Sequence, residues 1–98
     1  MSAFLDQTLG VIRAHRNDIE HRFGIRLLGV VGSVARGEES AQSDVDITYE
    51  VTGRPSLFTL VRAQDALAAL IGREVDLVDT RTMRPRARAY IERDLVLA

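Results

Sequence analysis

The feature that most constrains this chain is a stretch of 27 residues, 25–51, in which two strand-like runs flank a small-residue turn and a polar loop. The first run, residues 25–31, is apolar almost throughout, which is typical of a strand buried on both faces. The second run, residues 44–51, alternates between apolar and polar residues and therefore predicts a strand with one acidic face. Because side chains alternate along a strand, Asp44 and Asp46 are expected to point the same way.

The turn between the two runs suits an anion. Gly32 ends the first run, and residues 33–36 can begin a short helix whose free amides lie near Gly32 and Ser33. Open backbone amides bind phosphate, whereas paired carboxylates bind a divalent cation. The two ends of the stretch therefore suit phosphate chemistry with a metal ion. A simpler alternative is that Asp44 and Asp46 are only a solvated pair at the start of a strand.

A third acid favours the catalytic interpretation. Asp76 lies in a short predicted strand, residues 74–79, between two apolar residues, and a charge buried there without a partner would be costly. A shared magnesium ion would satisfy all three carboxylates, since magnesium prefers hard oxygen ligands and completes its shell with water and substrate phosphates. Two such ions can stabilise an in-line displacement. We therefore predict Asp44, Asp46 and Asp76 as catalytic metal ligands, with Asp76 also able to deprotonate the attacking hydroxyl.

Three further residues are predicted to hold the phosphates. Gly32 lets the backbone approach them closely, and Ser33 offers an amide and a hydroxyl. Arg36 has three interpretations: it contacts the triphosphate, it contacts the acidic loop that follows, or it is a solvated arginine.

Helical spacing predicts the scaffold around these strands. Residues 3–23 form an amphipathic helix with Ser2 as its cap, and residues 83–93 form a last helix with Pro85 in its first turn. A second long helix, capped by Ser56 and stopped by Gly72, carries an apolar stripe of Leu57, Leu60, Val61, Leu67 and Ile71. Residues 95–97 add a small edge strand or simply cover the core. The alternation of helices and strands predicts an α/β (α+β) fold.

The bulk properties set limits on function. The 98 residues predict one domain, 1–98, and the net charge of -1 argues against direct nucleic-acid binding. The absence of cysteine excludes disulfides and thiolate zinc sites and fits a cytoplasmic protein. The first residues resemble no signal peptide, and no membrane span is expected.

These residues together resemble a known family. Gly32-Ser33, ten residues, then Asp44-Val45-Asp46 resembles the signature of the nucleotidyltransferase superfamily that includes DNA polymerase beta. The fuller string Gly-Ser-x-Ala-Arg-Gly followed by Ser-Asp-x-Asp-Ile resembles its minimal nucleotidyltransferase branch, and Asp76 matches the third acidic position. The resemblance implies a small mixed sheet flanked by helices, magnesium as the metal, and ATP as the co-substrate.

The same resemblance suggests a partner. Many members of the minimal branch are antitoxins that transfer AMP from ATP onto a tyrosine of a HEPN-type ribonuclease toxin, and no departure from the motif is visible here. Two alternatives stay open: an antitoxin that neutralises its toxin by binding alone, and a nucleotidyltransferase with a small-molecule or nucleic-acid acceptor. The chain lacks the extra domain with which larger relatives hold small substrates, which favours a protein acceptor. An arginine cluster near the last helix is either a solvated face or a docking surface: Arg81, Arg84, Arg86, Arg88 and Arg93.

Overall fold

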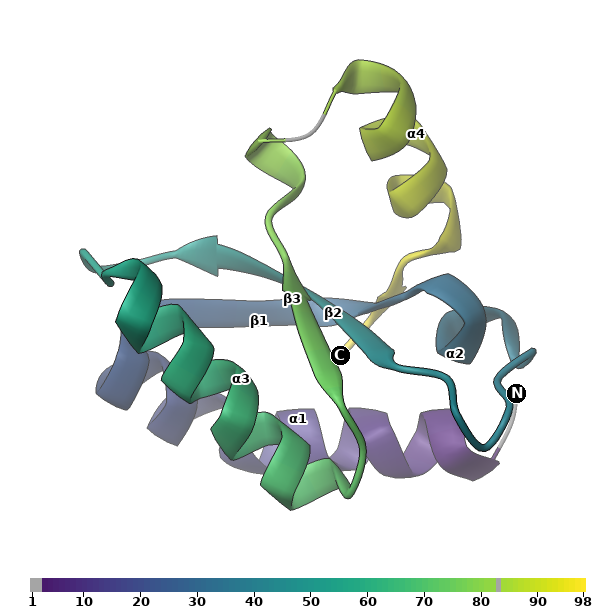
Figure 1. Ribbon diagram of the computed structural model, residues 1–98, viewed down its shortest axis with the longest axis horizontal. Coiled ribbons are helices and arrows are strands. Elements are labelled where there is room, and N and C mark those ends of the chain that lie inside the picture. Colours follow the sequence, from purple (N-terminus) through teal and green to yellow (C-terminus); the bar gives the residue numbers. More distant parts are fainter. Residues whose placement is uncertain (1–2, 83) are drawn as a thin grey trace.

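The computed structural model describes residues 3–82 and 84–98 and forms one mixed sheet with helices on both sides (Figure 1). The strand order is β3-β2-β1-β4, in which β1 pairs antiparallel with β2 and β4, and β2 pairs parallel with β3. This confirms the predicted small mixed α/β sheet. In chain order the elements are α1 (Ala3–Phe23), β1 (Ile25–Val31), α2 (Gly32–Arg36), β2 (Val45–Val51), α3 (Leu57–Ile71), β3 (Val75–Val78), the 3-10 helix η1 (Thr80–Thr82), α4 (Pro85–Asp94) and β4 (Val96–Leu97).

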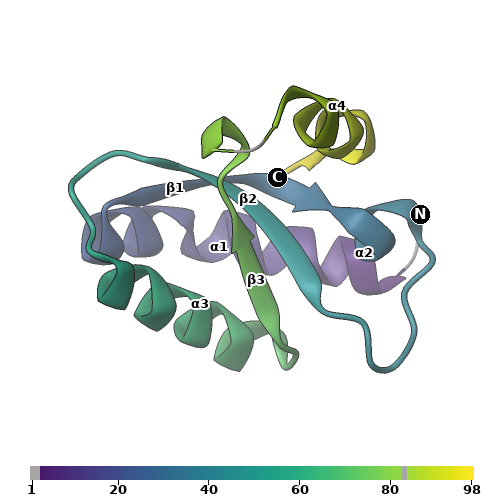
Figure 2. The ribbon, with the colours of Figure 1, turned by 45° about the horizontal axis from the view of Figure 1, so that its top comes forward.

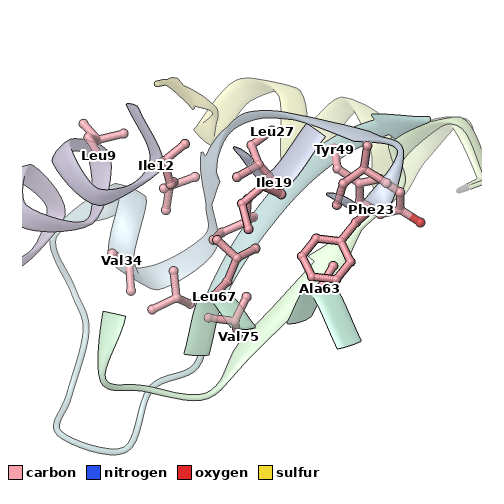
Figure 3. Close-up of a cluster of buried hydrophobic side chains, with 14 of the residues drawn as sticks. Leu9, Ile12, Ile19, Phe23, Leu27, Val34, Tyr49, Ala63, Leu67 and Val75 are labelled. Atoms are coloured by element: carbon pink, nitrogen blue, oxygen red, sulfur yellow. The ribbon is translucent and has the colours of Figure 1, made fainter. Parts of the chain in front are cut away.

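The two faces of the sheet are covered differently. Helices α1 and α3 lie together below the sheet, and α4 stands on the opposite side (Figures 1 and 2). The hydrophobic core fills the space between the sheet and the α1–α3 layer, where side chains of α1, α3 and the strands interdigitate (Figure 3). The α4 side is the more open of the two, and it is the side on which the acidic face of β2 lies.

Helix α1 follows the predicted stripe. Its buried apolar residues recur at helical spacing and rest on the sheet: Leu5, Leu9, Ile12, Ile19 and Phe23. Arg16, which interrupts that stripe, donates a hydrogen bond from Nη2 to the backbone carbonyl of Ala98 at 2.6 Å. The interruption therefore attaches α1 to the last residue of the chain, beside β4.

Helix α3 has the predicted ends and most of the predicted buried face. Ser56 caps it by accepting a hydrogen bond from the Thr59 amide at 3.1 Å, and Gly72 ends it with a φ of 83°. The predicted stripe was wrong at Leu57 and Val61, which are 78% and 46% exposed. The stripe is confirmed at Leu67, which is buried, and at Leu60 and Ile71, which pack against the core. The helix also buries Ala63, which was not predicted.

Several predicted boundaries shift by a residue or two. The predicted strand 44–51 begins at Val45, where the amide first joins the sheet by donating to the Glu74 carbonyl at 2.9 Å. The last helix begins at Pro85, because Arg84 has an extended ψ of 146° and a residue before proline disfavours the helical region. Residues 96–97 pair with β1, which confirms the edge-strand alternative. The predicted cap Ser2 and residue 83 lie outside the described residues. Among the helices of residues 3–82 and 84–98, none has the length and apolar character of a membrane span.

Candidate active site

The register of the sheet brings the turn and two of the acids together. Asp46 of β2 pairs with Val31 of β1 on one side and with Asp76 of β3 on the other. Val31 is the residue before Gly32, so the turn starts directly beside Asp46. Gly32, directly after β1, therefore lies next to Asp46 of β2, which pairs with Asp76 of β3. The three residues are far apart in the sequence.

Gly32 is required at the turn for two reasons. Its φ is 76°, a left-handed conformation that only glycine adopts without cost. A Cβ at this position would also lie 2.5 Å from Oδ2 of Asp46, well inside van der Waals contact. The Asp46 carboxylate thus occupies the space that a larger residue would need. Ser33 follows in the first turn of α2 and is half-buried beside it.

The environment of Asp46 disfavours its negative charge. The carboxyl group is half-buried, and burial is the largest cause that raises its pKa above the ordinary value. The negative charges of Asp76 and Asp44 raise this pKa further, whereas the positive charge of Arg36 acts in the opposite direction. A cation placed among the three carboxylates would relieve this repulsion, so the donor set fits a divalent metal ion.

The other two acids are open to solvent. Asp44 and Asp76 are both exposed, and neither side chain makes a hydrogen bond or ion pair with any residue that the structure describes. In residues 3–82 and 84–98, no three acidic or histidine side chains converge closely enough to hold a metal as they stand. The backbone positions of Asp46 and Asp76 are paired across neighbouring strands. The exposed side chains of Asp44 and Asp76 can turn toward a cation and its phosphate ligands.

Arg36 contacts carboxylates on two different elements. Its Nε donates to Glu38 at 3.2 Å, which confirms the predicted contact with the acidic loop, and its Nη1 donates to Asp94 at 2.7 Å. The contact with Asp94 was not predicted. It joins the end of α2 to the end of α4, so the arginine that follows the Gly32 turn also anchors the helix on the open face.

Two further side chains near the acids were not predicted from the sequence. Gln64 of α3 accepts a hydrogen bond from the Leu77 amide at 3.0 Å, directly after Asp76, and Arg73 donates to the Ser40 carbonyl at 2.7 Å in the loop before Asp44. These partners are 13 and 33 residues apart in the sequence. No local pattern signals such contacts, since they depend on how α3 and the 38–44 loop lie against β3.

Comparisons with known proteins agree with this geometry. The model of the nucleotidyltransferase domain family matches residues 12–97. The protein adenylyltransferase MntA of Thermococcus cleftensis is 35% identical over 92 residues, which cover 94% of this chain and 93% of that protein. A solved structure assigned to the minimal nucleotidyltransferases is 34% identical with a TM-score of 0.70, covering 90% of this chain and 93% of that one. A crystal structure of a toxin–antitoxin with AMP-PNP is 18% identical with a TM-score of 0.67, covers 94% of this chain and 69% of that one, and shows likeness of fold alone.

Proposed function

Because the chain belongs to the nucleotidyltransferase domain family, we propose that it is an antitoxin that transfers AMP from ATP onto a tyrosine of a cognate HEPN-type ribonuclease toxin. The observation that carries this proposal is the register that sets Gly32, Asp46 and Asp76 side by side. Two relatives support it: one is named a protein adenylyltransferase, and one structural neighbour is a toxin–antitoxin with AMP-PNP. The modification would neutralise the toxin in the cytoplasm, where ATP is abundant.

In this proposal Asp44, Asp46 and Asp76 hold magnesium. Two magnesium ions would offset the charge of the triphosphate and stabilise the attacking and leaving oxygens. Gly32 allows the phosphates to approach the backbone, and Ser33 donates its amide and hydroxyl to them. Asp76, on the exposed edge strand, takes the proton from the tyrosine hydroxyl. The tyrosine oxygen then bonds to the α-phosphorus as the bond to the pyrophosphate group breaks.

Arg36 is the third proposed nucleotide contact. Its guanidinium forms ion pairs with two carboxylates, those of Glu38 and Asp94. To bind the triphosphate it would exchange one of these carboxylates for a phosphate oxygen. Both ion pairs are partly exposed and screened by solvent, so either exchange is expected to cost little free energy.

The proposed toxin-docking surface comprises exposed arginines at the start of α4 and directly before it. Arg84 and Arg86 are exposed and lie at the start of the helix that stands over the open face (Figure 2). An acidic partner surface would complement their charge. If charge reversal by Arg84→Glu and Arg86→Glu together left toxin binding intact, this surface would not be the docking site.

The intact mass of the co-expressed partner tests the reaction. We expect the partner to gain the mass of AMP when expressed with the unchanged chain, and to gain none with Asp44→Ala and Asp46→Ala together. Asp6→Ala and Asp65→Ala, which remove exposed acids of α1 and α3, are the matched control and should leave the mass gain intact. If the chain without Asp44 and Asp46 still neutralised the toxin, and the toxin gained no mass, the proposal would be wrong. That result would favour the binding-only antitoxin.

A further inference from the structure

The loop that precedes Asp44 is held by hydrogen bonds from a residue outside the proposed site. Residues 40–43 form a compact turn in which the Ser40 amide donates to Oγ of Ser43 at 2.8 Å and the Ser43 amide donates to the Ser40 carbonyl at 3.2 Å. Arg73, which lies between α3 and β3, donates from Nη1 to the Ser40 carbonyl at 2.7 Å and to the Ser43 carbonyl at 3.3 Å. One guanidinium therefore holds both ends of the turn.

The guanidinium is itself fixed in place. Its central carbon lies 4.3 Å from the centre of the Phe4 ring, and Phe4 is a half-buried residue in the first turn of α1. An arginine over an aromatic face is attracted to it and loses freedom to rotate. Arg73 thus links the turn to α1, the longest helix of the fold, although nothing in its local sequence marks it as structural.

The backbone is hydrogen-bonded on both sides of Asp44, and its two partners, Arg73 and Glu74, are consecutive in the sequence. On its N-terminal side the Ser43 carbonyl accepts from Arg73, and on its C-terminal side the Val45 amide donates to the Glu74 carbonyl at 2.9 Å. Asp44 makes no hydrogen bond of its own with the described residues. Its position beside Asp46 therefore depends on how firmly its two neighbours are held.

We infer that Arg73 is a positioning residue that holds the 40–43 turn so that Asp44 meets the metal in the correct place. The inference rests on the proposed function, in which Asp44 is a metal ligand. Residues that orient metal ligands through hydrogen bonds commonly change metal affinity by about 10–100-fold when removed. Arg73 acts on the backbone around the ligand, and it does not touch the substrate or the metal.

Arg73→Met tests this role, because methionine keeps an apolar stem over Phe4 and removes the donors. In the protein without metal or nucleotide, we expect the amides of residues 40–43 to exchange with solvent deuterium about ten-fold faster or more, since a bond from a charged donor is lost. In AMP transfer, we expect the Mg²⁺ concentration for half-maximal rate to rise about ten-fold, with the rate at saturating Mg²⁺ nearly unchanged. Arg73→Lys, which restores a cationic donor, should recover part of both effects.

Arg13→Met is the matched control, because Arg13 is an exposed arginine of α1 whose side chain makes no hydrogen bond or ion pair with the described residues. Amide exchange in the turn that is unchanged by Arg73→Met overturns the inference, whatever the enzyme activity. So does faster exchange with an unchanged Mg²⁺ requirement in an active enzyme. If the unchanged chain transfers no AMP, the proposed function fails, while amide exchange still decides whether Arg73 holds the turn. If Arg73→Met does not fold, the same readouts apply to Arg73→Lys and to Phe4→Leu.

Discussion

Replacing Gly32 by alanine should separate the stability of the fold from its chemistry. The left-handed φ of 76° costs an alanine about 1–2 kcal/mol. For a domain of this size, 1 kcal/mol corresponds to roughly 4–8 °C in Tm, so Gly32→Ala should lower the Tm by about 4–16 °C. The added methyl group would also lie 2.5 Å from Oδ2 of Asp46. Because that oxygen ends a flexible side chain, the carboxylate rotates away, which disturbs the chemistry more than the stability.

The matched control is Gly72→Ala. Gly72 ends α3 with a φ of 83°, and a Cβ there meets no atom within 4 Å. This variant therefore bears the same backbone cost without touching a carboxylate. Both variants should lose similar stability in thermal unfolding followed by circular dichroism. Only Gly32→Ala should lose AMP transfer, by about 100-fold, since displacing a catalytic group by an ångström has an effect of this size.

The comparison must be made at a temperature where both variants are folded, with transfer measured by the mass of the modified partner. AMP transfer by Gly32→Ala that equals transfer by Gly72→Ala would refute the reasoning, because the carboxylate of Asp46 would then tolerate the displacement. A loss of stability in Gly32→Ala far beyond that of Gly72→Ala would show that Asp46 cannot rotate away. The energetic account of the turn would then be wrong.

Three other predictions follow from contacts around the site. Since the pKa of Asp46 is raised in the folded state, the metal-free protein should lose stability as pH rises from near the ordinary value of 3.8 through the raised pKa, and Asp46→Asn should abolish this loss in urea unfolding. If the pH dependence of Asp46→Asn matched that of the unchanged protein, another group would be responsible. Asp94→Ala removes a partly exposed ion pair with Arg36, so the free energy of unfolding should hardly change, while amide exchange in α4 accelerates; unchanged exchange would show that the pair does not anchor α4. Gln64→Leu leaves the part-buried Leu77 amide without an acceptor and should cost about 1–3 kcal/mol in the same urea assay; a stability equal to that of the unchanged protein would mean that water replaces the glutamine.

The two strands that carry Asp46 and Asp76 could be predicted because the alternation of apolar and polar residues is a local property of the sequence. Period-two alternation in residues 44–51 and 74–79 is enough to put Asp46 and Asp76 on one face of their strands, and the structure pairs them directly. The same alternation puts Thr48 on the acidic face with Asp46, and it does not predict that Thr48 is only 1% exposed and donates to the Gly29 carbonyl at 3.3 Å. Its burial depends on packing between distant segments, which a local period does not encode.

Contacts that close over long sequence separations could not be predicted. Arg36 and Asp94 are 58 residues apart, and charge pattern alone offered the nearer Glu38 as a partner. In α3 the predicted stripe contained the buried Leu67 but also the exposed Leu57 and Val61, because apolar residues occur on more than one face of the helix and nothing local distinguishes them. Helical spacing identified the helix, but only the approach of the sheet decides its rotation.

The parallel pairing of β3 at the edge of the sheet has a consequence for how such proteins diversify. Asp46 lies in one of the two central strands, whereas Asp76 is an exposed residue of a four-residue edge strand. A substitution at Asp46 alters the packing of the turn, but one at Asp76 leaves the folded framework almost untouched. Natural selection can therefore retain, replace or discard the third acid with little penalty in folding. In the proposed mechanism, in which Asp76 is a catalytic acid, descendants of such a chain could lose catalysis through this one position and survive as folded proteins that only bind.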